Sequence, residues 1–83
     1  MKHASRLSLE GLEPLLAALR TRAGLREKNF GVFYWRSKPY LHFHEDPAGL
    51  FADVMMEGAW VRFAVNTPAE REALLGAVDR VVG

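Results

Sequence analysis

The fold is decided by residues 30–65, which read FGVFYWRSKPYLHFHEDPAGLFADVMMEGAWVRFAV. Short segments rich in turn residues, at 36–39, 46–49 and 57–58, divide this stretch into four apolar or aromatic runs. Aromatic and β-branched residues favour strands, and connections this short force consecutive strands to pair antiparallel. The stretch therefore predicts a four-stranded antiparallel meander with the strands in sequence order, formed by Phe30–Trp35, Tyr40–His44, Leu50–Met56 and Trp60–Val65.

A helix is predicted before the meander. Leucines recur there at the i, i+3, i+4, i+7 spacing of one helix face, as Leu12, Leu15, Leu16 and Leu19. Pro14 must lie in the first turn, where its missing N–H costs little, so the helix is expected to begin near Gly11. Gly24 is suited to end it.

A second helix is predicted after the meander. Thr67-Pro68-Ala69-Glu70 has the pattern of a capping box with proline at the first helical position. An apolar face follows, and the helix is expected to run to Gly83. The predicted fold class is α+β, a two-layer sandwich in the order α-β-β-β-β-α with both helices on one face of the sheet. Residues 1–83 are expected to form a single domain, in which residues 1–8 could be a flexible tail.

Strand alternation sorts the meander into two faces once two-residue loops are assumed at Ser37-Lys38, Pro47-Ala48 and Glu57-Gly58. The face predicted to lie under the helices is almost wholly apolar and consists of Phe30, Val32, Tyr34, Leu41, Phe43, Ala52, Val54, Met56, Val61, Phe63 and Val65. The second face should be polar if water covers it. Five aromatic rings and a methionine instead surround a few polar groups on it: Phe33, Trp35, Tyr40, His42, His44, Phe51, Asp53, Met55, Trp60 and Arg62.

The apolar character of the second face predicts that something covers it, because monomers rarely expose large apolar patches. We expect a small non-enzymatic binding or interaction domain that forms a homodimer through this face. A small-molecule ligand is an alternative occupant of the same face. We expect neither a cofactor nor a catalytic residue, because the sequence contains no cysteine, no nucleophile elbow and no glycine-rich phosphate loop.

Three polar residues of the second face should lie in one row across neighbouring strands, because the same register places His42 opposite Asp53 and Asp53 opposite Arg62. His42 and His44 also share one face of a strand, about 7 Å apart along it. With Asp53 they form a candidate metal or small-molecule site. The spacing of two histidines favours two surface or interface residues over metal ligands, and His3 falls in the expected tail.

Nucleic-acid binding is a further alternative for the aromatic face. Sheets that bind single strands stack bases on exposed rings and hold phosphates with basic residues. Residues 1–38 carry eight basic and three acidic residues, and 39–83 carry three basic and seven acidic ones. Asp53 lies in the middle of the aromatic face, however, which argues against a phosphate-binding platform.

The stretches GVFYWRSKPYLHFHEDPAGLFADV (31–54) and WVRFAVNTPAEREALLGAV (60–78) are similar to small bacterial proteins of uncharacterised function. More loosely, they resemble MmcQ/YjbR-type and YdhG-type compact domains. The resemblance implies strands around an Arg-Ser-Lys turn that lead through a meander into a capped C-terminal helix. It also implies the nucleic-acid alternative, since DNA binding has been suggested for some of those domains.

The composition is that of a globular chain, with 49% hydrophobic residues and a net charge of +1. The absence of cysteine excludes a disulfide scaffold. No apolar stretch has the length of a signal-peptide core or a membrane span. We therefore expect a cytoplasmic protein of bacterial type that makes no membrane contact.

Overall fold

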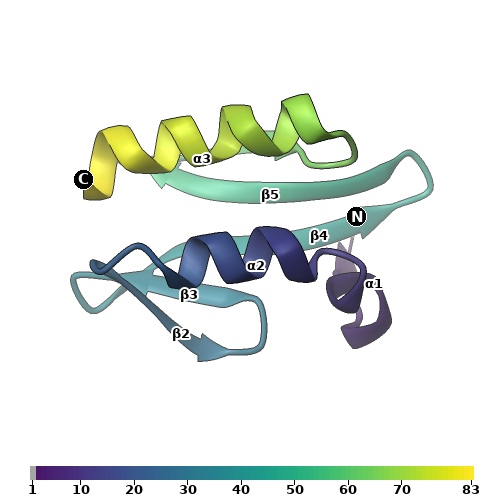
Figure 1. Cartoon of the computed structure of the whole chain (residues 1–83), viewed down its shortest axis with the longest axis horizontal. Helices are drawn as coiled ribbons and strands as arrows, with labels where there is room; N and C mark the ends of the chain where they lie inside the picture. Colours follow the sequence, from purple (N-terminus) through teal and green to yellow (C-terminus); the bar gives the residue numbers. More distant parts are fainter. Residues whose placement is uncertain (1) are drawn as a thin grey trace.

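The computed structural model describes residues 2–83, and within them it contains one antiparallel sheet of six strands and three helices (Figure 1). The predicted α+β class with an antiparallel sheet is confirmed. The helices and strands are β1 Lys2–His3, α1 Arg6–Glu10, α2 Glu13–Arg20, β2 Leu25–Asn29, β3 Val32–Trp35, β4 Lys38–Asp46, β5 Gly49–Met56, β6 Ala59–Ala64 and α3 Pro68–Val82.

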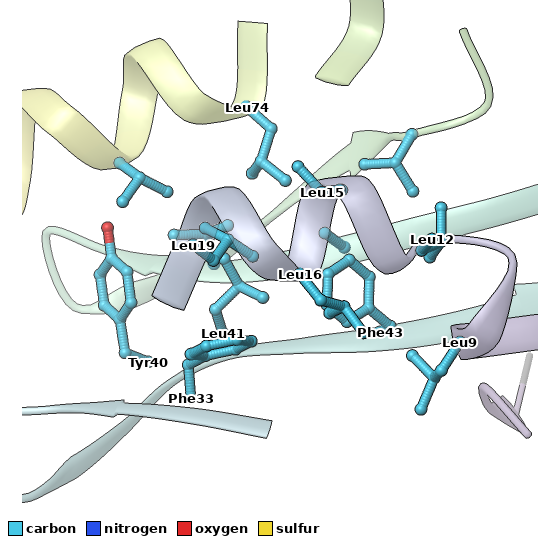
Figure 2. Close-up of a cluster of buried hydrophobic side chains, with 14 residues drawn as sticks. Leu9, Leu12, Leu15, Leu16, Leu19, Phe33, Tyr40, Leu41, Phe43 and Leu74 are labelled. Atoms are coloured by element: carbon cyan, nitrogen blue, oxygen red, sulfur yellow. The ribbon is translucent and has the colours of Figure 1, made fainter. Parts of the chain in front are cut away.

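The sheet has the order β2-β3-β4-β5-β6, and β1 pairs with the far end of β4. Helices α2 and α3 both lie over one face of it, as Figure 1 shows, and the other face carries no helix. Leu16 of α2 lies toward Phe43 of the sheet, and Leu15 lies toward Leu74 of α3 (Figure 2). Fully burying one such side chain contributes about 1.5–3 kcal/mol, so this layer is a main source of hydrophobic stabilisation.

Both helix starts follow local chemistry. The predicted capping box of α3 is present, because the Glu70 N–H donates to Thr67 Oγ1 at 3.1 Å and the Glu70 carboxylate accepts from the Thr67 N–H at 3.1 Å. Helix α2 begins with Pro14 in its first turn and ends at Arg20, with Thr21 as its C-cap where Gly24 was expected to end the helix.

Three elements were not predicted. Strand β2 has no aromatic or β-branched residue and forms at the sheet edge by backbone pairing with β3. Residues 2–10 contain β1 and α1, where residues 1–8 were expected to be a tail. Ser5 caps α1 by accepting from the Ser8 N–H at 3.2 Å. The sheet consequently has six strands where the sequence predicted four.

The register of the two later hairpins is as predicted. Asp46 pairs with Gly49 around the Pro47-Ala48 loop, and Met56 pairs with Ala59 around Glu57-Gly58. Residues on the predicted helix-covered face of β4 and β5 are buried in the core, as expected from the sequence: Leu41, Phe43, Ala52 and Val54.

The first hairpin differs from the prediction by one residue. Its loop is Arg36-Ser37, and Trp35 pairs with Lys38. A loop at Ser37-Lys38 would make Pro39 flank the turn, where a backbone N–H must donate, and proline has none. The loop at Arg36-Ser37 instead pairs Pro39 with Tyr34, one pair further from the turn. At that pair the two backbones exchange no hydrogen bonds, so a residue without an N–H fits.

A β-bulge then changes the pairing again. Phe33 pairs with Leu41, where the predicted register placed it opposite His42, and Tyr40 is the extra residue on β4. A shift of one residue exchanges the two faces of a strand. The predicted placement of Phe33, Trp35 and Tyr40 on the second face is therefore wrong, and so is that of Val32 and Tyr34 under the helices. Phe33 and Tyr40 are buried in the core, and Trp35 packs against it.

The loop Arg36-Ser37 supplies a stability prediction. Both residues have positive φ, 54° and 68°, as a two-residue turn matched to the twist of the strands requires. This conformation disfavours any residue with a Cβ. Ser37→Gly should raise the free energy of unfolding by about 0.5 kcal/mol, and Tm by a few degrees, in thermal unfolding followed by circular dichroism.

Ala48→Gly is the matched control. Ala48 occupies a two-residue hairpin loop as well but does not have a positive φ. Glycine there only adds freedom to the unfolded chain, so it should lower stability by about 0.5 kcal/mol. Equal effects of the two substitutions would contradict this account of the turn.

Glu27 supplies a pH-dependent prediction. Its carboxylate accepts from Arg20 Nε at 2.6 Å and from the Gly31 N–H at 2.8 Å, which ties α2 to the β2–β3 turn. The hydrogen bond from Arg20 lowers the pKa of Glu27 below its usual value. A carboxyl with a lowered folded pKa stabilises the fold above its unfolded pKa of about 4.3, and this contribution is lost as pH falls through the folded pKa.

Glu27→Gln should consequently destabilise the protein at pH 7 and progressively less toward pH 3, as measured by urea unfolding at several pH values. Glu72→Gln, at an exposed position of α3, is the control and should show a small difference at every pH. A Glu27→Gln deficit that stays constant down to pH 3 would show that the ion pair does not carry the effect.

Candidate functional site

The face of the sheet without helices, called the open face here, carries the candidate site. Strand alternation places on it seven of the ten residues that the sequence predicted there, namely His42, His44, Phe51, Asp53, Met55, Trp60 and Arg62. Without Phe33, Trp35 and Tyr40, the face is more polar than expected. It presents a histidine cluster beside an ion pair whose carboxylate is buried. It also presents three aromatic rings, those of Phe51, Trp60 and Tyr34, of which the exchange of faces in β3 adds Tyr34.

The predicted row of three polar residues is present in the backbone register. His42 pairs with Asp53, and Asp53 pairs with Arg62. Arg62 Nε donates to Asp53 Oδ1 at 2.8 Å and Arg62 Nη2 donates to Oδ2 at 2.9 Å, a bidentate geometry. Asp53 is only 7% exposed, and its hydrogen bonds from Arg62 lower its pKa, so a buried negative charge is fixed at the middle of the face.

His44, two pairs along from His42, is the histidine that reaches this carboxylate. Its Nε2 lies 3.2 Å from Asp53 Oδ2, in a diagonal contact between neighbouring strands. The same nitrogen lies 2.9 Å from His42 Nδ1. The two imidazoles thus direct ring nitrogens at one another beside a carboxylate oxygen, an arrangement that the alternation of His42 and His44 predicted only in outline.

A third histidine completes the cluster. Strand β1 pairs His3 with His44, and the two rings stack with centroids 4.8 Å apart. The candidate ligand nitrogens of His3, His42 and His44 all lie within 4.8 Å of one another. These are the three histidines of the whole chain, and the fold brings them together from strands 39 or more residues apart in sequence.

Sequence reasoning missed His3 because a two-residue strand is too short to show a periodic pattern. Two contacts of residues 2–4 with β4 hold this short strand in place. Lys2 lies 3.7 Å from Glu45 in an ion pair, and the Ala4 N–H donates to the Phe43 carbonyl at 3.1 Å. These contacts align β1 with the end of β4 and place His3 on the open face.

Burial controls the protonation of the cluster. It lowers the pKa of both His42 and His44 below the usual value, because desolvation disfavours the charged imidazolium. The neutral form, with a free lone pair on one ring nitrogen, is thereby favoured near pH 7. Trp60 forms one side of the cluster, since its ring meets that of His42 edge-on at 4.6 Å.

No match is found for the chain among models of protein families, curated proteins or solved structures. The resemblance to MmcQ/YjbR-type and YdhG-type domains therefore stays an interpretation of the sequence. Among residues 2–83, no helix is long and apolar enough to cross a membrane. The geometry of the open face is what a functional proposal has to rest on.

Proposed function

We propose that the protein binds a divalent transition-metal ion, with Zn²⁺ the best fit, through His3, His42 and His44. The observation that carries the proposal is the convergence of all three histidines on one point of the open face. Three imidazoles with a position left for a further ligand are an established zinc arrangement. Imidazole also suits Cu²⁺ and Ni²⁺, so geometry, which is tetrahedral for zinc, separates the candidates.

The distances are compatible with one ion. Tetrahedral zinc with bonds of 2.0–2.1 Å to nitrogen separates its ligand atoms by about 3.3 Å. His42 and His44 already hold their nitrogens 2.9 Å apart, and all three ligand atoms lie within 4.8 Å. His3 is exposed, so a small rotation of its side chain would close the remaining distance.

Asp53 supports the proposal electrostatically. Its carboxylate lies beside His44 Nε2 and would offset part of the dication's charge. The bidentate hydrogen bonds from Arg62 hold that carboxylate in place, as partners outside the ligand set usually do in metal sites. The neutral imidazoles would supply the lone pairs that bind the ion. The buried carboxylate would supply the negative charge that attracts it.

Untagged protein should bind one Zn²⁺ per chain in isothermal titration calorimetry. Co²⁺ should give the intense visible absorption of tetrahedral coordination. His3→Gln, which changes an exposed residue, should weaken Zn²⁺ binding at least tenfold, and His42→Gln and His44→Gln should do so too, since even partners outside the ligand set change metal affinity 10–100-fold.

Lys28→Gln is the matched control, because it removes an exposed cation of β2 and keeps all three imidazoles and the contacts of β1. It should leave zinc affinity within about twofold, as expected for a solvent-exposed charge. Absence of zinc binding by the wild type at millimolar metal, or binding that survives all three histidine substitutions, would refute the proposal.

A homodimer was expected through the aromatic sheet face, and a specific observation favours a different interface, the edge strand β6. It is a terminal strand of the sheet, and its residues Ala59–Arg62 are exposed, with Trp60 at 45% and Val61 at 39%. Exposed edge strands without proline or lysine readily pair with another chain. We propose pairing of two copies along β6 as the second candidate, which would bury both apolar side chains.

Light scattering after size-exclusion chromatography at high micromolar concentration tests the dimer. The wild type should have twice the chain mass, and Trp60→Glu should have the mass of a folded monomer. Leu7→Glu, at another exposed apolar residue with 79% exposure, is the control and should stay dimeric. A wild type that is monomeric under these conditions would eliminate this candidate.

The nucleic-acid alternative is weakened by the corrected register. Three of the five rings proposed as a stacking platform, those of Phe33, Trp35 and Tyr40, lie on the side of the helices. Of those five, the open face keeps Phe51 and Trp60, next to the buried charge of Asp53, and it gains Tyr34. Three rings around a carboxylate give this function less support than metal binding has.

A further inference from the structure

A second concavity lies away from the histidine cluster, at the end of the sheet where the β3–β4 and β5–β6 hairpins meet the last turn of α3. Its volume is about 620 Å³, within the range of sites that bind small molecules. None of the three histidines, nor Asp53, lines it. Whatever it binds is therefore independent of the proposed metal site.

The body of the cavity is apolar and aromatic. The rings of Trp35 and Tyr40 lie 5.7 Å apart and tilted by 58°. Met56, which alternation places on the helix side of β5, lines the same cavity, and its neighbour Met55 borders it. Methionine sulfur and tilted aromatic rings both make favourable contacts with a flat aromatic group.

The charged residues of the cavity are mainly basic. Arg36, Lys38 and Arg80 line it, with Glu57 as the acidic residue among them. This imbalance is local, because the net charge of the whole chain is only +1. A partly apolar wall strengthens the attraction of these cations for an anion, because the effective dielectric is lower there than in water.

Arg36 is held at this position by two features. Its guanidinium carbon lies 4.4 Å from the centroid of the Trp35 ring, in a cation–π contact. Its backbone has a φ of 54°, which a residue with a long side chain rarely adopts. Glycine or asparagine would suit such a turn better.

Tyr40 adds a polar group that the fold itself leaves unused. Its side chain lines the cavity and is only 2% exposed, and its buried hydroxyl has no hydrogen-bond partner among the described residues. Burial raises the pKa of this hydroxyl, so it stays a neutral donor. An unpaired buried donor is uncommon in folded proteins and calls for an acceptor.

We propose that this cavity binds a small organic anion with an aromatic body, an aromatic carboxylate. The ring of the ligand would lie against Trp35 and the methionines, and its carboxylate would be recognised by the basic side chains and by the Tyr40 hydroxyl. Neither an uncharged aromatic molecule nor a small inorganic anion would satisfy both parts of the cavity.

The probe for the test is 2-naphthoate, titrated into metal-free wild-type protein and followed by amide chemical shifts in NMR spectra. Saturable shifts should concentrate at the Trp35–Tyr40 hairpin and the end of α3. Two further compounds separate the parts of the proposal, since 2-naphthamide keeps the rings without the charge and acetate keeps the charge without the rings. Both should bind at least tenfold more weakly than 2-naphthoate.

Three variants locate the recognition of the carboxylate. Tyr40→Phe removes only the unpaired hydroxyl and should weaken binding about tenfold, the scale of one hydrogen bond to a charged group. Lys38→Gln, at an exposed position, should also weaken it and serves if Tyr40→Phe fails to fold. Arg26→Gln removes an exposed cation that does not line the cavity, and it should change nothing.

Equal binding of 2-naphthoate and 2-naphthamide would overturn the proposal, since it would show an apolar crevice without anion recognition. Absence of saturable shifts at millimolar 2-naphthoate, or shifts centred on the histidine cluster, would overturn it too. Because the titration is made without metal, none of these outcomes depends on whether the histidines bind zinc.

Discussion

The turn at Pro39 and the bulge at Tyr40 are what separate the two candidate sites onto opposite faces of the sheet. The missing N–H of Pro39 excludes a loop at Ser37-Lys38 and moves the turn to Arg36-Ser37, and a bulge at Tyr40 follows it. The bulge exchanges the faces of the strand before it and leaves the strand after it unchanged. Trp35 and Tyr40 therefore face the helices at the cavity, while His42 and His44 keep their place on the open face.

The sequence predicted best where turn chemistry and alternation agree. Asp46-Pro47-Ala48-Gly49 and Glu57-Gly58 admit one loop placement each, and the register of β4, β5 and β6 followed from them. The opposition of Asp53 to His42 and Arg62 was thereby predictable before any coordinates. Its side-chain partner was not, because a diagonal contact, here from His44, depends on rotamers rather than on register.

Long-range contacts explain what the sequence left unpredicted. The residues of β2, LREKN, have little strand preference, and this strand exists because β3 offers it a partner. Strand β1 has only two residues, and its ion pair with Glu45 spans more than half of the chain. His3 could not be assigned to the candidate site without that pairing, so the sequence identified two of its three histidines.

A purely structural role accounts for only part of the histidine cluster. The buried charge of Asp53 needs a partner, and Arg62 supplies it with two hydrogen bonds. The contact from His44 adds to that pair, but neither His42 nor His3 is needed for it. His3 is exposed and adds nothing to the hydrophobic core. Stability therefore gives no reason for His3 to stack on His44 beside His42. A metal ion bound by all three imidazoles would give one.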